Sequence, residues 1–412
     1  MIVFILRKST YLFLFLGMNF QLISCTNSAK KSNTKTHEIS TDTIVEVGAV
    51  QTSKYLNLLK RKKIAVVANQ TSVIFKNTDV TKNSTTHLVD SLLNLGLSVK
   101  KVFSPEHGFR GTADAGEDVE DGIDAKTGLP ILSLHGKHKK PSKKHLKDID
   151  VVIFDIQDVG VRFYTYISTL HYVMEACAEN AIPLIVLDRP NPNAHYIDGP
   201  VLEAKHSSFV GKHEVPVVYG MTIGEYGQMI NGEKWLKNGV QCNLTVVSLK
   251  NYTHHTKYSL PIKPSPNLPN DKSINLYPSL GFFEGTTINA GRGTVYQFQR
   301  YGASFFDKTP FSYTPKANEG AKYPKHKDKL CYGVDLRKTK RLSKIDLSFL
   351  IDAYQKTPKK ELFFGKTFTI HAGTETLQKQ IEQGLSEQEI RKTWENGLQA
   401  FKVLRTKYLI YD

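Results

Sequence analysis

A cluster of acidic and amide side chains follows a short apolar run in this 412-residue chain. Residues 151–154 are Val-Val-Ile-Phe, a run typical of a strand that is buried on both faces. The run ends in Asp155, Gln157 and Asp158, and Gly160 then interrupts the pattern. Because ligands of open α/β sheets bind beyond the carboxyl ends of the strands, we predict a functional site at this turn.

Glu106 is the sharpest candidate for acid–base chemistry. It lies between Pro105 and His107 on a glycine-bounded loop that follows the predicted strand 99–103. A partly desolvated glutamate has a raised pKa, which suits it to protonate a leaving oxygen. The structural alternative is a salt bridge to Arg110.

Hydrolysis of a glycosidic bond usually needs a second carboxylate across the cleavage point. The sequence leaves this partner open among Glu117, Asp118, Asp155, Asp158 and Glu284. A separation of ~5 Å between the two carboxyl groups would favour retention of configuration, and ~6.5 to 9.5 Å would favour inversion. These acids could instead hold a metal with His107, His135 and His138, but the spacing matches no familiar ligand pattern, and we expect no metal.

Polar side chains end four of the predicted strands in the same way. The predicted strands 63–68, 99–103, 151–154 and 183–187 are followed by Asn69, Glu106, Asp155, and Asp188-Arg189 with Asn191. Singly, helix caps, turn bonds or a salt bridge would explain each of them, but four together favour a concave site.

Strands and helices alternate along the first two thirds of the chain. Further strands are predicted at 130–134 and 244–249, and helices at 87–95, 162–180 and 222–236. This alternation predicts an α/β fold with a mostly parallel, doubly wound sheet. No G-x-G-x-x-G or G-x-x-x-x-G-K-[ST] motif occurs, so we expect neither a nucleotide nor another cofactor.

The net charge of +16 favours an anionic partner or surface. The lysines are scattered through loops instead of alternating with aromatic residues on one element, so we expect no nucleic-acid binding.

The first 24 residues have the pattern of a signal peptide. Arg7 and Lys8 precede the apolar run 11–16, which is too short to span a bilayer, and Leu-Ile-Ser-Cys25 follows. This resembles a bacterial lipoprotein signal, which implies cleavage before Cys25, its acylation, and a lipid-anchored periplasmic or outer-membrane protein of the cell envelope. An uncleaved anchor is the alternative. Residues 25–45 are expected to form a flexible tether.

Four prolines between 261 and 269 indicate a boundary, so we predict an α/β domain over 46–262 and a smaller α+β domain over 263–412. In the second domain we expect a strand at 362–370 and helices at 377–383 and 386–405. The three cysteines beyond Cys25 have no C-x-x-C spacing, which indicates neither a disulfide framework nor a zinc site.

Six sequence blocks carry a family resemblance. They are Ser104-Pro-Glu-His-Gly-Phe-Arg-Gly, Phe154-Asp-Ile-Gln-Asp-Val-Gly-Val-Arg-Phe-Tyr-Thr-Tyr, Leu187-Asp-Arg-Pro-Asn-Pro, Gly220-Met-Thr-Ile-Gly-Glu, Ser265-Pro-Asn-Leu-Pro, and Glu284-Gly-Thr with Gly291-Arg-Gly-Thr. In type and order they resemble the exo-β-N-acetylmuramidase family of NamZ type, formerly a domain of unknown function.

The resemblance implies a Rossmann-like domain, a smaller C-terminal domain and an active site between them. It also implies metal-independent removal of terminal N-acetylmuramic acid from the non-reducing end of peptidoglycan fragments. We expect Glu106, Asp155 and Glu284 to be catalytic. The expected substrate-binding residues are Asn69, His107, Gln157, Asp158, Arg162, Tyr164, Asn191 and Arg292. A non-catalytic lipoprotein that binds cell-wall muropeptides is the second hypothesis.

Muramic acid differs from N-acetylglucosamine by a lactyl carboxylate, which a guanidinium can hold through two charge-assisted bonds. Arg162 begins the central helix and Arg292 lies between two glycines, so either could bind this group. Arg189 adjoins Asp188 and is expected to form a structural bridge instead.

Overall fold

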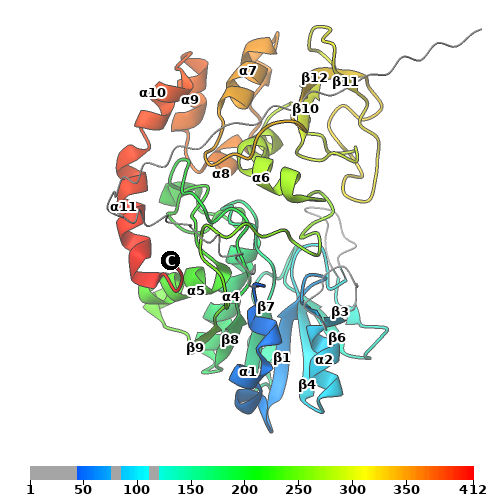
Figure 1. The fold of residues 1–412 in the computed structure, drawn as a ribbon, viewed down its shortest axis with the longest axis vertical. Helices are drawn as coiled ribbons and strands as arrows, with labels where there is room; N and C mark the ends of the chain where they lie inside the picture. Colours follow the sequence, from blue (N-terminus) through cyan, green and yellow to red (C-terminus); the bar gives the residue numbers. More distant parts are fainter. Residues whose placement is uncertain (1–43, 76–84, 111–119) are drawn as a thin grey trace, which may run out of the picture. The chain divides into compact units, whose positions relative to one another are not determined.

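A seven-stranded sheet forms the centre of the N-terminal half of the chain (Figure 1). The structure is a computed structural model that describes residues 44–75, 85–110 and 120–412. The strand order is β5-β6-β4-β1-β7-β8-β9, and every pair is parallel except β5 with β6. The strands are β1 (Lys63–Ala68), β4 (Ser98–Ser104), β5 (Gly122–Ile123), β6 (Pro130–Ser133), β7 (Val151–Asp155), β8 (Leu184–Leu187) and β9 (Leu244–Val247).

This order confirms the predicted Rossmann-like, mostly parallel sheet. The chain builds outward from β1 through β4 to β6, and then returns to the other side of β1 with β7. The direction of winding therefore reverses between β1 and β7, which is where open α/β sheets form their ligand crevice.

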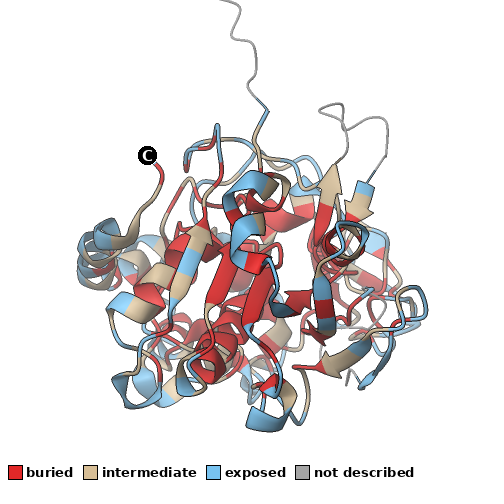
Figure 2. Ribbon diagram, turned by 90° about the horizontal axis from the view of Figure 1, so that it is seen from below, coloured by how far each residue is buried: buried red, intermediate tan, exposed pale blue. Residues whose placement is uncertain are grey.

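Helices cover both faces of the sheet because successive strand residues point to opposite sides. Ile64 and Val66 pack in one hydrophobic cluster with α1 and α2, whereas Ala65 and Val67 pack in another with α4 and α5. Figure 2 shows buried residues along the strands and exposed residues on the outer helices. These helices are α1 (Thr52–Leu59), α2 (Leu88–Asn94), α4 (Tyr166–Glu179) and α5 (Ile223–Gly232), and a short α3 (Lys143–Leu146) precedes β7.

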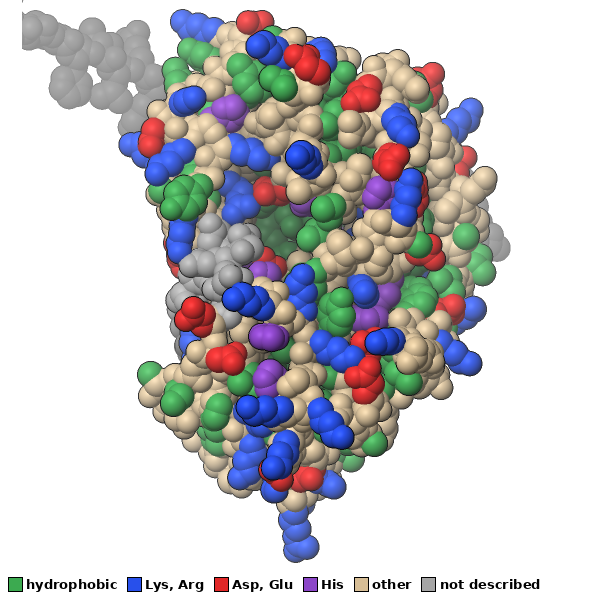
Figure 3. All heavy atoms as spheres, turned by 180° about the vertical axis from the view of Figure 1, so that it is seen from behind, with side chains coloured by type: hydrophobic (Ala, Val, Ile, Leu, Met, Phe, Trp, Pro, Cys, Tyr) green, Lys and Arg blue, Asp and Glu red, His purple; other side chains and the backbone are tan. Residues whose placement is uncertain are grey.

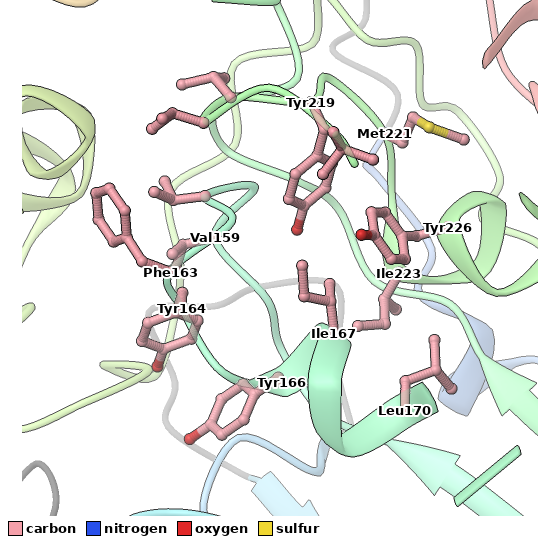
Figure 4. Packing of buried hydrophobic residues seen from close by; sticks show 14 of the residues in the cluster. Val159, Phe163, Tyr164, Tyr166, Ile167, Leu170, Tyr219, Met221, Ile223 and Tyr226 are labelled. Atoms are coloured by element: carbon pink, nitrogen blue, oxygen red, sulfur yellow. The ribbon is translucent and has the colours of Figure 1, made fainter. Parts of the chain in front are cut away.

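The central helix α4 lies against α5 in the larger cluster. Figure 4 shows Ile167 and Leu170 of α4 beside Ile223 and Tyr226 of α5. All four side chains are nearly or fully buried, and each contributes on the order of 2 kcal/mol through removal of apolar surface from water. This packing fixes α4, and its first turn is thereby held at the carboxyl edge of the sheet.

A capping box begins α5, the helix predicted from residue 222. The Glu225 amide donates to Thr222 Oγ1 at 3.2 Å, and the Thr222 amide donates to Glu225 Oε2 at 2.9 Å. The turn after β7 depends on Gly160, whose φ is +75° and whose missing side chain leaves room for the Asn191 amide.

The C-terminal part is smaller and mainly helical, with one antiparallel sheet in the order β10-β12-β11. A two-stranded sheet, β2 with β3, lies in the N-terminal half. The elements are β2 (Val73–Phe75), β3 (Thr85–His87), α6 (Asp271–Leu280), β10 (Arg300–Ala303), β11 (Ser312–Tyr313), β12 (Cys331–Asp335), α7 (Ser348–Lys356), α8 (Phe368–Ala372), α9 (Thr376–Glu382), α10 (Glu387–Lys392) and α11 (Glu395–Arg405).

The predicted strand at 362–370 is wrong. A 3-10 turn ends at Leu362, and α8 begins at Phe368. Phe364 packs against Phe363 and Phe368 with ring centroids 4.7 and 4.5 Å apart. This tertiary packing overrides the strand preference of aromatic residues. The helix predicted over 386–405 is divided into α10 and α11.

The last residues of the chain return to the α/β part, beside α5 in Figure 1. The Tyr411 hydroxyl donates to Asp188 Oδ2 at 2.7 Å, and the Ile410 amide donates to Glu225 Oε1 at 2.8 Å. The predicted domain boundary at 262/263 remains a prediction.

Among the described residues, no helix has the length and apolarity needed to cross a membrane. Cys177, Cys242 and Cys331 are buried free thiols.

Candidate functional site

A pocket of about 150 Å³ lies where the carboxyl edge of the sheet meets the C-terminal part of the chain. Figure 3 shows a hollow on one face, with an apolar floor and with acidic, basic and histidine side chains near its rim. Sequence positions that are far apart meet in this pocket. Its described lining residues are Glu106, His107, Phe163, Tyr164, Thr165, Val210, Ser265, Asn267, Leu268, Tyr277, Glu284, Arg292, Phe298 and His371.

Glu106 enters the pocket from the turn after β4. His107 and Gly108 have positive φ angles of 72° and 80°, which turn the backbone sharply at this point. Glu106 is 9% exposed, and its Oε2 accepts a 2.6 Å hydrogen bond from the Thr165 hydroxyl. The alternative partner Arg110 donates instead to Asp124 at 2.7 Å. The carboxylate is thus oriented by a hydroxyl and not by that arginine.

Thr165 lies at the N-terminus of α4, yet its hydroxyl does not cap that helix. The hydroxyl donates to Glu106, so the first turn of α4 holds the carboxylate in place. The partial positive charge of a helix N-terminus further favours a negative group there. The central helix therefore positions Glu106 from the opposite side of the strand-end crevice.

Glu284 faces the same pocket from the C-terminal part. Arg292 Nη1 donates to Glu284 Oε2 at 3.0 Å, and both side chains are about one-quarter exposed or less. Arg292 lies between Gly291 and Gly293, both with φ of +80°, so the backbone turns on either side of it. Burial raises the pKa of Glu284, but the charges of Arg292, Lys325 and His371 outweigh it and hold that pKa below its ordinary value.

Tyr277 connects the two carboxylates electrostatically. Burial raises its pKa, and the negative charges of Glu284 and Glu106 raise it further. Both carboxylates therefore act on one phenol of the lining, although they come from opposite parts of the chain. Two carboxylates within one small pocket are the groups that acid–base hydrolysis of a glycosidic bond requires.

His371 lines the pocket from α8. Its Nδ1 lies 3.1 Å from the Thr367 carbonyl, which assigns the ring hydrogen to Nδ1 and leaves Nε2 as an acceptor. Burial lowers the pKa of His371, which favours the neutral ring.

An aromatic wall completes the pocket. The Tyr277 ring lies edge-on to Phe163 and Phe298, at centroid distances of 5.2 and 4.8 Å. The Tyr164 hydroxyl donates to the Pro264 carbonyl at 2.8 Å, and Figure 4 shows this hydroxyl and that of Tyr166 on the same side. Asn267 adds a polar group, because its Oδ1 is a buried acceptor without a partner among the described residues.

Asp155 is not among the described lining residues. It forms a buried, bidentate ion pair with Arg189, at 2.6 Å from Nε and 2.9 Å from Nη2. Arg189 is thus structural, as expected, but its ionic partner is Asp155 and not the adjacent Asp188. The ion pair joins the C-terminal end of β7 to the turn after β8.

Four other predicted binding residues hold the turns behind the pocket. Asn69 Nδ2 donates to Tyr166, and Asn191 Nδ2 donates to the Met221 carbonyl, each at 2.8 Å. Gln157 Nε2 donates to the Pro190 carbonyl at 2.6 Å. Asp158 accepts from the Tyr219 hydroxyl and from the Gly160 amide, and burial raises its pKa to about 7.

Arg162 is also outside the described lining. Its guanidinium is fully buried and donates to four carbonyl groups. Nη1 bonds to the carbonyls of Pro200 and Val215, and Nη2 to those of His371 and Ala372. Arg162 therefore fastens α8, and with it His371, to the segment before α4.

Three predicted residues lie outside the described residues: Glu117 and Asp118, two candidate partners of Glu106, and the predicted acylation site Cys25. In the part of the chain that is described, no group of three His, Cys, Asp or Glu side chains could hold a metal ion. His107, His135 and His138 therefore form no such group with the described acidic residues.

The structure therefore gathers Glu106, His107, Tyr164, Glu284 and Arg292 of the predicted set into one pocket. The sequence analysis missed several polar lining residues. Thr165 and Asn267 lie inside two of the quoted sequence blocks, which was a usable signal. Tyr277 and His371 come from helices without such a block.

Comparisons with known proteins identify relatives over nearly the whole chain. The family described as exo-β-N-acetylmuramidase NamZ, N-terminal, matches residues 64–272, and its C-terminal counterpart matches 275–411. The peptidoglycan β-N-acetylmuramidase NamZ of Bacillus subtilis is 37% identical over 432 aligned residues, covering 98% of this chain and 100% of the relative.

Two crystal structures of DUF1343 family proteins from Bacteroides fragilis are also similar. One is 44% identical with a TM-score of 0.81, and the other is 29% identical with a TM-score of 0.77. Each comparison covers 90% of this chain and 99% of the other chain.

Proposed function

Because the chain belongs to the NamZ family of exo-β-N-acetylmuramidases, we propose that it releases terminal N-acetylmuramic acid from the non-reducing end of peptidoglycan fragments. We further propose that hydrolysis takes place in the pocket that contains Glu106 and Glu284. The observation that carries this proposal is the meeting of two carboxylates, one from each part of the chain, around a single aromatic wall.

The two carboxylates have different surroundings, which supports different roles. Glu284 is held ionised by Arg292 and suits the role of base or nucleophile at the anomeric carbon. Glu106 lies across the pocket in a nearly buried position and supplies the proton to the leaving oxygen. Thr165 fixes the orientation of Glu106, and such orientation is a large part of catalytic rate enhancement.

Arg292 is the proposed partner of the lactyl carboxylate. Its guanidinium lines the pocket, whereas that of Arg162 is committed to four carbonyl groups. A second carboxylate on Arg292 would share its charge with Glu284. The bound lactyl group would therefore weaken the influence that lowers the Glu284 pKa, and substrate binding would make Glu284 more basic.

Asp155 is proposed to act on structure and not on chemistry. Its charge is neutralised by Arg189 inside the protein, at a position outside the described lining. Asn69, Gln157, Asp158 and Asn191 act in the same way, through hydrogen bonds that shape the strand-end turns. Tyr164 and His107 remain in the proposed binding set.

We propose that acylation of Cys25 anchors the protein in the cell envelope. Peptidoglycan fragments are present in that compartment. The charged start, short apolar run and Leu-Ile-Ser-Cys25 ending support this. Cys25→Ala should move the protein from the membrane fraction to the soluble fraction. Unchanged membrane association would refute acylation of Cys25 and support the uncleaved anchor.

The activity is tested with a disaccharide in which N-acetylmuramic acid is β-linked to N-acetylglucosamine. The purified protein should release both monosaccharides, and chromatography of the products measures this. Binding of the disaccharide without turnover would refute the proposal and would support the non-catalytic cell-wall-binding alternative.

A further inference from the structure

A second pocket, of about 260 Å³, adjoins the first one. Glu284 and Arg292 line both pockets, so the ion pair between them forms a shared wall. The other described lining residues of this side pocket are Ile288, Asn289, Ala290, Ala321, Tyr323, Pro324 and Lys325.

The described lining of the side pocket contains more basic than acidic side chains. It contains two cations, Arg292 and Lys325, and one anion, Glu284, while the remaining lining residues are uncharged. Two neighbouring cations in a partly buried position attract a bound anion. The apolar side chains of Ile288 and Ala290 provide a surface on which an aliphatic group beside that anion can pack.

Lys325 has a hydrogen-bond donor to spare. Its Nζ donates to the carbonyls of Phe283 at 2.6 Å and of Glu284 at 3.1 Å. A lysine ammonium has three N–H donors, so one remains for a ligand. These two bonds also hold the ammonium at the base of the shared wall, beside Arg292.

The polar amide of the pocket is already used. Asn289 Nδ2 donates to the carbonyls of Arg292 and Lys325, and its Oδ1 accepts from the Gly291 amide. Arg292 and Lys325 are therefore the groups of this pocket that can bind a ligand's anionic group. The class of ligand that fits is a small carboxylate with an adjacent aliphatic group.

We propose that the side pocket binds the lactyl ether of the muramyl residue, with Lys325 and Arg292 together holding its carboxylate. This assignment rests on the proposed function and adds Lys325 as a specificity-determining residue. The sugar ring occupies the first pocket between the two carboxylates. Its acidic substituent extends across the shared wall into the second pocket.

Equilibrium binding of two free sugars tests this assignment independently of turnover. Calorimetric titration compares N-acetylmuramic acid with N-acetylglucosamine, which lacks the lactyl group. The wild-type protein should bind N-acetylmuramic acid about tenfold or more tightly than N-acetylglucosamine, in the range of hydrogen bonds to a charged group. Lys325→Met should remove most of this preference, and Lys325→Arg should restore part of it.

Lys327→Met is the matched control. It removes the same charge from an exposed position two residues away, outside the described lining of the side pocket. We expect this variant to keep the wild-type preference for N-acetylmuramic acid. Circular dichroism checks that all three variants are folded.

Three results would overturn the assignment: equal wild-type affinity for the two sugars, an equal loss of both affinities in Lys325→Met, or the same effect in Lys327→Met. An equal loss would mean that Lys325 only supports the Glu284 backbone. If the protein binds N-acetylmuramic acid selectively but hydrolyses no muramyl disaccharide, the proposed catalysis fails while this assignment stands.

Discussion

Replacement of Arg292 by methionine should move the acid side of the pH–rate profile to higher pH. Glu284 must be ionised to act as base or nucleophile, so kcat/KM falls as the pH drops through its pKa. In the wild-type protein burial raises this pKa, and the charges of Arg292, Lys325 and His371 lower it by more. Replacement of Arg292 leaves the effect of burial in place and removes the largest of the charges that lower the Glu284 pKa.

The size of this shift follows from the geometry of the ion pair. Unit charges 4 Å apart interact by about 4 kcal/mol at the effective dielectric constant of a protein surface. Arg292 and Glu284 are 3.0 Å apart, but their side chains are 20% and 25% exposed, so solvent reduces the net value to about 1.5–3 kcal/mol. Since one pKa unit corresponds to about 1.4 kcal/mol, the acid limb should rise by about one to two pH units.

The assay is kcat/KM on the muramyl disaccharide from pH 3 to pH 8, for the wild type, Arg292→Met and Arg292→Lys. Lysine keeps the positive charge, so its acid limb should lie nearer to that of the wild type. An acid limb that stays in place in Arg292→Met, or moves to lower pH, would refute the role given to this ion pair.

Three further variants test the surroundings of the pocket. Thr165→Val removes the 2.6 Å bond to Glu106 and should lower kcat about tenfold, which is the effect of losing a hydrogen bond to a charged group. Thr165→Ser keeps the hydroxyl and should keep the wild-type kcat. Equal rates for the two variants would exclude a positioning role for Thr165. Asp155→Asn leaves the charge of the buried Arg189 without its ionic partner, so it should lower the free energy of unfolding by about 3 kcal/mol while the rate per folded molecule is retained. A large loss of rate without destabilisation would show that Asp155 takes part in catalysis. The pKa of Asp158 is raised to about 7, so its contribution to stability is full below its unfolded value of 3.8 and is lost as the pH rises through 7. Urea unfolding should therefore show Asp158→Asn gaining stability relative to the wild type, by up to about 4 kcal/mol, between pH 4 and pH 8, and a constant difference would contradict the buried, raised pKa.

Local patterns in the sequence were enough to predict the sheet and its polar edge. Residues 63–68 form β1 with the predicted bounds, and the helix predicted from residue 222 begins at its N-cap Thr222. Glu106 follows a predicted strand and does line the pocket. These features depend on residues that are neighbours in the chain, which is why periodicity and turn chemistry predict them.

The partners of the charged side chains depend on the tertiary fold. Asp155 and Arg189 are 34 positions apart, and only the pairing of β7 with β8 brings them together. Arg162 resembles a ligand-binding arginine in its position before a helix, yet it bonds to carbonyls more than 200 residues away. A sequence pattern contains no signal for these distant partners, so residue type alone could not separate Arg162 from Arg292.

The C-terminal lining of the pocket was equally hidden. Tyr277 and His371 reach the pocket from α6 and α8, and the second of these helices was predicted to be part of a strand. Aromatic residues favour strands in isolation, whereas here they pack against one another and against the turn that carries Glu284.

The central claim is that Glu106 and the pocket around it hydrolyse a muramyl glycoside. Its most direct test is kcat for release of N-acetylmuramic acid by Glu106→Gln, with Glu361→Gln as an exposed control outside the described lining of the pocket. Glutamine keeps the shape of the side chain but cannot transfer a proton, so kcat should fall by roughly 10² or more, while the control keeps the wild-type rate. Wild-type turnover by Glu106→Gln would contradict the claim.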